Sequence, residues 1–137
     1  MAVLDLQAIR YINLLDEASR VKTSKCFGYN NTIIFAVPKF LVSRAIGHDA
    51  INVRRIQEKL GKRVRIIREA HGIEDAEGFI REVISPVSFK SVDIKDGTII
   101  LNAGIRSKAA LIGRNRRREV ELKQIVKDTF GMELRIV

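Results

Sequence analysis

The sequence predicts an α+β protein built from two tandem units, each with the element order α-β-β-α-α-β. Three observations lead to this prediction. A helix–loop–helix–strand pattern occupies residues 38–66, and the same pattern returns at residues 105–136. Each copy also follows a helical pattern and two short strand patterns joined by a tight turn. Because 137 residues hold little beyond two such units, we expect domains at 1–70 and 71–137.

The first unit opens with an amphipathic helix and a hairpin. Residues 4–18 repeat apolar side chains at helical spacing, and residues 24–28 and 32–37 are rich in strand-forming types. Asn30 and Asn31 lie between the two strands, and asparagine tolerates the left-handed backbone that a tight turn requires. We therefore expect a helix followed by a β-hairpin.

The next segment predicts two helices around a glycine-led loop. Pro38 suits the first position of a helix, where its missing N–H costs nothing. The loop at 47–50 separates this helix from a second one, whose apolar stripe is Val53, Ile56 and Leu60. Gly61 suits the end of that helix, and residues 63–66 alternate as a half-buried strand does.

The second unit repeats the order. Asp96-Gly97 is a strong hairpin signal, and Ser85-Pro86 ends the helix before it. The expected elements are a helix at 73–84, strands at 87–94 and 98–103, a helix at 105–112, a loop at 113–116, a helix at 117–130 and a strand at 132–136.

The two copies differ in length by about one helical turn. Gly47 and Gly61 are 14 residues apart, whereas Gly113 and Gly131 are 18 apart. Since four residues make roughly one turn, the longer helix keeps the same face buried. Tandem duplication of one unit is the simplest explanation.

The charge of the chain favours a polyanionic partner. The net charge is +9, and residues 1–68 hold 13 Lys/Arg against 5 Asp/Glu. Residues 106–118 add six cations and no acid. Such clusters are typical of proteins that bind nucleic acid or rest on an acidic surface.

Composition argues against several other classes of protein. Cys26 is the only cysteine, so a reducing, cytoplasmic location is expected, with Cys26 as a small core residue. The apolar run at 33–37 is far too short to cross a membrane, and Asp5 interrupts any signal peptide. His48 and His71 fit neither a zinc site nor a catalytic triad. We expect a non-enzymatic protein with no metal, cofactor, membrane partner or small-molecule substrate.

Acidic residues on the fourth predicted helix left one enzymatic alternative, a metal nuclease. They are better explained as favourable partners of a helix N-terminus and of solvent. These residues are Glu74, Asp75, Glu77 and Glu82.

Both loops resemble a known family. The runs at 45–53 and 111–116, within α-β-β-α-α-β units, resemble the loop and following helix of type II KH domains. The tandem pair, with its ending at 134–137, resembles the archaeal form of the transcription factor NusA. The resemblance implies a three-stranded sheet with helices on one face in each unit. It also implies a groove for roughly four nucleotides of single-stranded RNA per unit, with RNA polymerase as a further partner, in transcription elongation, termination or antitermination.

The candidate RNA-binding residues are the two loops, their flanking isoleucines and the cations near them. In the first unit they are Arg44, Ile46, Gly47, His48, Asp49, Ala50, Arg54, Lys62 and Arg63. In the second they are Arg106, Lys108, Ile112, Gly113, Arg114, Asn115, Arg116 and Arg117.

Two features of the loops depart from that family. Ala50 and Arg116 stand where a second glycine is expected, and the bulkier Arg116 either reaches a phosphate or blocks close backbone approach. RNA binding is therefore expected more from the first unit. We interpret Asp49 as an N-cap of the following helix, as Asn115 is in the second copy. A protein-docking adaptor on RNA polymerase and a ribosomal RNA-binding protein are the alternatives.

Overall fold

The structure of the protein, a computed structural model, describes residues 6–137 and confirms the α+β class. Two three-stranded sheets and six α-helices occur in that part of the chain, and the element order is the same in both halves. This is the arrangement expected of two tandem KH-like domains. The chain separates between Glu69 and Ala70 into two compact units. Leu4, assigned to the first helix from the sequence, lies outside the described residues.

The first sheet has the order β1-β2-β3. Strand β1 (Lys25–Tyr29) runs antiparallel to β2 (Thr32–Val37), which pairs in parallel with β3 (Arg63–Arg68). Parallel neighbours cannot be joined by a tight turn, so the chain must cross over between β2 and β3. That crossover contains the candidate loop.

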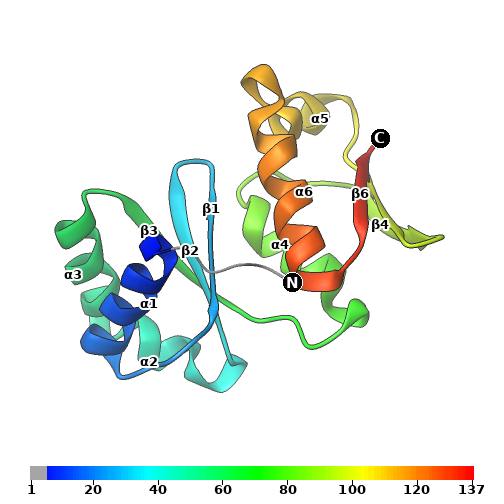
Figure 1. Ribbon diagram of the computed structural model, residues 1–137. Helices are drawn as coiled ribbons and strands as arrows, with labels where there is room; N and C mark the ends of the chain where they lie inside the picture. Colours follow the sequence, from blue (N-terminus) through cyan, green and yellow to red (C-terminus); the bar gives the residue numbers. More distant parts are fainter. Residues whose placement is uncertain (1–5) are drawn as a thin grey trace. The chain divides into compact units, whose positions relative to one another are not determined.

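Helices cover one face of this sheet. The crossover consists of a 3₁₀ turn at Lys39–Leu41, helix α2 (Val42–Ile46) and helix α3 (Ile51–Leu60). Helix α1 (Leu6–Ser19) lies beside α3 on the same side of the sheet (Figure 1). Alternate residues of β2 point into the core that these helices share with the sheet. The buried side chains of that core are Tyr11, Leu15, Val21, Ile33, Phe35, Val37, Ala45, Ile56 and Val64.

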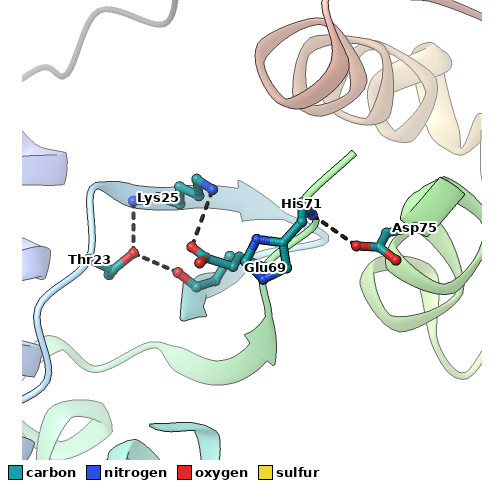
Figure 2. A network of polar contacts seen from close by, with 6 residues as sticks. Thr23, Lys25, Glu69, His71 and Asp75 are labelled. Atoms are coloured by element: carbon teal, nitrogen blue, oxygen red, sulfur yellow. Dashed lines mark hydrogen bonds and ion pairs between the residues drawn. The ribbon is translucent and has the colours of Figure 1, made fainter. Parts of the chain in front are cut away.

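The start of β1 is bonded to β2 and to the residue that follows β3. The Thr23 hydroxyl donates to the Ala36 carbonyl (2.6 Å) and accepts from the Lys25 backbone N–H (3.0 Å). The Lys25 ammonium pairs with the Glu69 carboxylate at 3.2 Å, directly after β3 (Figure 2). These contacts hold the hairpin in register with the end of β3.

The second unit has the same topology, with the sheet order β4-β5-β6. Its strands are β4 (Ser91–Lys95), β5 (Thr98–Asn102) and β6 (Glu133–Ile136), and β5 and β6 are parallel. Its helices are α4 (Ala76–Ile84), α5 (Ile105–Ile112) and α6 (Arg117–Phe130). The Phe79 ring of α4 meets the Phe130 ring of α6 edge-on, with centroids 5.7 Å apart. Before α4, the Asp75 carboxylate accepts a hydrogen bond from the His71 backbone N–H at 2.9 Å (Figure 2).

The turns adopt the backbone conformations that their sequences predict. Asn30 and Asn31 have φ of 53° and 56°, and Asp96 and Gly97 have φ of 51° and 73°. Both hairpins are therefore closed by two left-handed residues, the pattern whose twist matches that of the strands. Gly61 ends α3 in a left-handed conformation, and Gly131 ends α6 in the same way.

Two boundaries predicted from the sequence are wrong by four residues each. The strand expected at 87–94 is confined to Ser91–Lys95, because β5 offers only five residues to pair with. Pro38 precedes a 3₁₀ turn instead of beginning an α-helix, and α2 starts at Val42.

Helix α1 provides a matched test of the core. Leu15 is fully buried, whereas Leu6 on the same helix is 86% exposed. Leu15→Ala is expected to lower the free energy of unfolding by about 2–5 kcal/mol, since it removes apolar contacts and leaves a cavity. Leu6→Ala is expected to change it by less than about 0.5 kcal/mol. Urea denaturation of both variants measures the difference, and equal losses would contradict this orientation of α1.

Candidate nucleic-acid interface

The two candidate loops have the same backbone despite different sequences. Each contains a glycine with φ near +80° and ψ near 170°, one further residue, and then two left-handed residues before the next helix. The φ values are 82° at Gly47, 53° at Asp49, 58° at Ala50, 73° at Gly113, 56° at Asn115 and 59° at Arg116. A conformation that non-glycine residues avoid is thus built twice at equivalent positions.

The leading glycines are required by space as well as by φ. A Cβ on Gly47 would lie 2.8 Å from Asn52 Nδ2, and a Cβ on Gly113 would lie 2.6 Å from Arg118 Cγ. Helix α3 or α6 therefore begins so close to the loop that no side chain fits between them. This close approach packs the start of each helix against the backbone of its loop.

The buried Asn52 side chain stabilises the first loop. Its side chain is 8% exposed, and its Nδ2 donates to the Arg44 carbonyl of α2 at 3.1 Å. The bond joins the two helices across the loop. Sequence reasoning missed Asn52, although its position four residues before Ile56 marks it as a polar residue on the buried stripe. Arg118 takes the equivalent place in the second unit and pairs with Glu121 at 2.7 Å.

The expected role of Asp49 as a helix N-cap is wrong. An N-cap residue has an extended backbone, but Asp49 is left-handed, and no side chain caps α3. The Asp49 carboxylate is 76% exposed and lies 3.3 Å from the His48 imidazole. Asn115 has the same conformation and also makes no cap bond. The first loop therefore carries an exposed acid at its rim.

The candidate cations do not all lie near the loops. Arg44 precedes the first loop and Arg54 follows it on α3, and both are exposed. Lys62 and Arg63 follow the far end of α3, about 15 Å from the loop for a ten-residue helix. The Lys62 ammonium instead lies 3.5 Å from the Tyr11 hydroxyl of α1.

In the second unit the cations are closer together. Arg106 and Lys108 are exposed on α5, which leads directly into the loop, and Arg114 and Arg117 are exposed within and after it. The Arg116 side chain is 73% exposed, and its guanidinium forms an ion pair with the Glu119 carboxylate at 3.4 Å. Ile46 and Ile112, the residues before the glycines, are half-buried.

Both loops lie at the ends of long segments without acidic residues. No Asp or Glu occurs in residues 18–48 or in residues 97–118. The first segment contains both hairpin strands and the helix before the loop, and the second contains β5, the helix before the loop and the loop itself. The surface beside each loop is consequently suited to attract phosphates.

The described part of the chain shows no group of three or more His, Cys, Asp or Glu side chains that could hold a metal ion. Within residues 6–137, none of the helices has the length and apolar character needed to cross a membrane.

Comparison with known proteins confirms the resemblance to archaeal NusA. No protein-family model matches the chain. Three archaeal proteins named "Probable transcription termination protein NusA" are similar to it. The protein from Halococcus morrhuae is 28% identical over 89 residues, 65% of this chain and 62% of that protein. The one from Methanococcus vannielii is 25% identical over 114 residues, 80% of this chain and 64% of that protein. The one from Methanocaldococcus jannaschii is 24% identical over 139 residues, 98% of this chain and 74% of that protein.

The matched regions thus span just under two thirds of the first two relatives. Among solved structures, the crystal structure of APE1850 has the same fold. Its TM-score is 0.67 at 24% identity, with 98% of this chain and 99% of that one covered.

Because the Ala50 backbone is left-handed, we expect a glycine substitution there to stabilise the protein, whereas glycine in a helix destabilises it. Ala50→Gly is expected to raise the free energy of unfolding by about 0.5–1 kcal/mol, because glycine adopts positive φ without strain. Ala109, exposed within α5, provides the control: Ala109→Gly is expected to lower it by roughly 0.5–1 kcal/mol. Thermal and urea denaturation measure both, and equal destabilisation would contradict the loop conformation.

Proposed function

We propose that this protein binds single-stranded RNA and acts as a transcription elongation or termination factor, antitermination included, with RNA polymerase as a second partner. Residues 1–70 and 71–137 would be its two type II KH domains. The observation that carries the proposal is the loop backbone, formed twice by different residues beside an acid-free basic segment. The similarity to three proteins named for transcription termination supports the process.

Each loop has features of a phosphate-binding site. The helix dipole favours an anion at each helix N-terminus, beside the N–H groups of Ala50 and Arg116, which already donate to the Gly47 and Gly113 carbonyls. Helices α3 and α6, of 10 and 14 residues, both begin at a loop. Gly47 and Gly113 let these helices begin directly against the loop backbone, since a Cβ at either position would meet Asn52 or Arg118.

The two candidate phosphate-binding loops differ in charge. The first loop contains His48 and the exposed Asp49 carboxylate, whereas the second contains Arg114 and Arg116 around the neutral Asn115. Asp49 opposes a phosphate, and Arg114 attracts one. We therefore expect the second loop to attract phosphate more strongly, contrary to the expectation from the sequence that the first unit binds RNA better, because Asp49 is exposed instead of capping the helix.

The exposed acid in the first loop is also the observation that favours the second candidate function. A protein-docking adaptor on RNA polymerase would use the same basic faces on an acidic protein surface, and it would tolerate Asp49. Ribosomal RNA is a further RNA target that the same chemistry would fit. Binding to short single-stranded RNA without other proteins distinguishes the proposal from the adaptor.

Phosphate binding predicts a specific response to salt. The affinity for labelled single-stranded RNA is expected to fall with salt, at a log–log slope of about 0.7 per phosphate contact. Arg114→Glu removes a loop contact, so it is expected to reduce both the affinity and the slope. Arg10→Glu, at an exposed position on α1, makes the same change in net charge away from the loops and provides the control. Equal losses of RNA affinity in the two variants would indicate only non-specific electrostatic attraction. An absence of RNA binding by the wild-type protein would favour the adaptor function.

Removing the acid from the first loop is expected to strengthen binding. Asp49→Asn reproduces the residue type of the second loop and keeps a side chain that tolerates positive φ. Loss of one exposed repulsive charge is expected to raise RNA affinity by about two- to five-fold at low salt and by less at high salt. Titrations at two salt concentrations measure this, and an unchanged affinity at both would show that the first loop does not contact phosphate.

A further inference from the structure

Phe40 is an exposed aromatic residue in the 3₁₀ turn that precedes α2, the helix leading to the first loop. It is 83% exposed, whereas the other five phenylalanines and both tyrosines are buried or half-buried in the described residues. Phe35 and Phe89, for example, lie in the core at 0% and 9% exposure.

Phe40 and the first loop lie at the two ends of the same short helix, α2. Phe40 lies in the 3₁₀ turn that runs into α2, Arg44 follows one turn later, and Gly47 begins the loop. Seven residues at helical rise span about 10–14 Å. At the rise of roughly 3.4 Å per nucleotide that a strand has when its bases are stacked as in a duplex, about three or four nucleotides cover that distance. A strand with one phosphate at Gly47 can therefore place a base at Phe40.

The charges around Phe40 fit a nucleic acid. Lys39 and Arg44 are exposed on either side of it, and the nearest acids in sequence are Glu17 and Asp49. An aromatic ring between cations stacks a base while the cations meet the flanking phosphates. In the second unit Arg106 stands at the position equivalent to Phe40, and the residue before it, Ile105, is 94% exposed at the start of the helix leading to that loop.

We propose that Phe40 is a base-stacking residue of the first unit, which makes RNA binding there depend on a nucleobase as well as on phosphates. This inference rests on the proposed RNA-binding function. Ile105 offers the second unit an apolar contact without an aromatic face, so the two units differ in how strongly they hold a base.

A comparison of normal and abasic RNA tests the stacking directly. For a labelled single-stranded RNA, Phe40→Ala is expected to lower affinity by about 5- to 150-fold, and Phe40→Tyr is expected to retain it. For the matching abasic ribose-phosphate strand, wild type and Phe40→Ala are expected to bind equally. The salt slope is expected to stay unchanged, because no phosphate contact is lost. Leu6→Ala, at a position 86% exposed in the same unit, is expected to have no effect on either strand.

An optical test supplements the titration. The chain has no tryptophan, so Phe40→Trp introduces a single indole. Its emission is expected to be quenched by the normal strand and not by the abasic one. Equal affinity of wild type and Phe40→Ala for normal RNA, with Arg114→Glu still weakened, would overturn the stacking role and leave the proposed function standing. No binding of either RNA by the wild-type protein would overturn both.

Discussion

The turn between two helices within four residues is the constraint on which the rest of this structure depends. Parallel pairing of β2 with β3, and of β5 with β6, requires a crossover, and both crossovers are made of two helices. Each loop meets the requirement with a glycine and two left-handed non-glycine residues. Such residues are strained by roughly 1–2 kcal/mol each and persist because the surrounding structure holds them.

Different side chains hold the strained loop backbone in the two copies. In the first, the buried Asn52 side chain bonds to the last turn of α2 and fills the space beside Gly47. In the second, Arg118 fills the equivalent space and is held by Glu121. One backbone is therefore maintained by a neutral hydrogen bond in one unit and by a half-buried ion pair in the other. The conformation itself is what the duplicated units share.

The candidate site was predictable only where its chemistry is local. Glycine at a positive-φ position is a local requirement, and both loop glycines followed from their neighbours in the sequence. Whether a cation lies near a loop depends on helix length and direction, so Lys62 was grouped with the first loop although α3 separates them. The exposure of Phe40 depends on which face of the turn meets the core, and the residues around it in the sequence do not determine that face.

The sequence by itself determined the duplicated order of elements, the two hairpin turns and the glycines that end α3 and α6, because backbone preferences act over a few adjacent residues. The tertiary structure decided the parallel pairing in each sheet, the short extent of β4 and the outward direction of the Asp49 carboxylate. Each of these depends on a partner far away in the chain or on the space left by the packed helices. Local preferences propose conformations, and long-range packing selects the surface on which a ligand could bind.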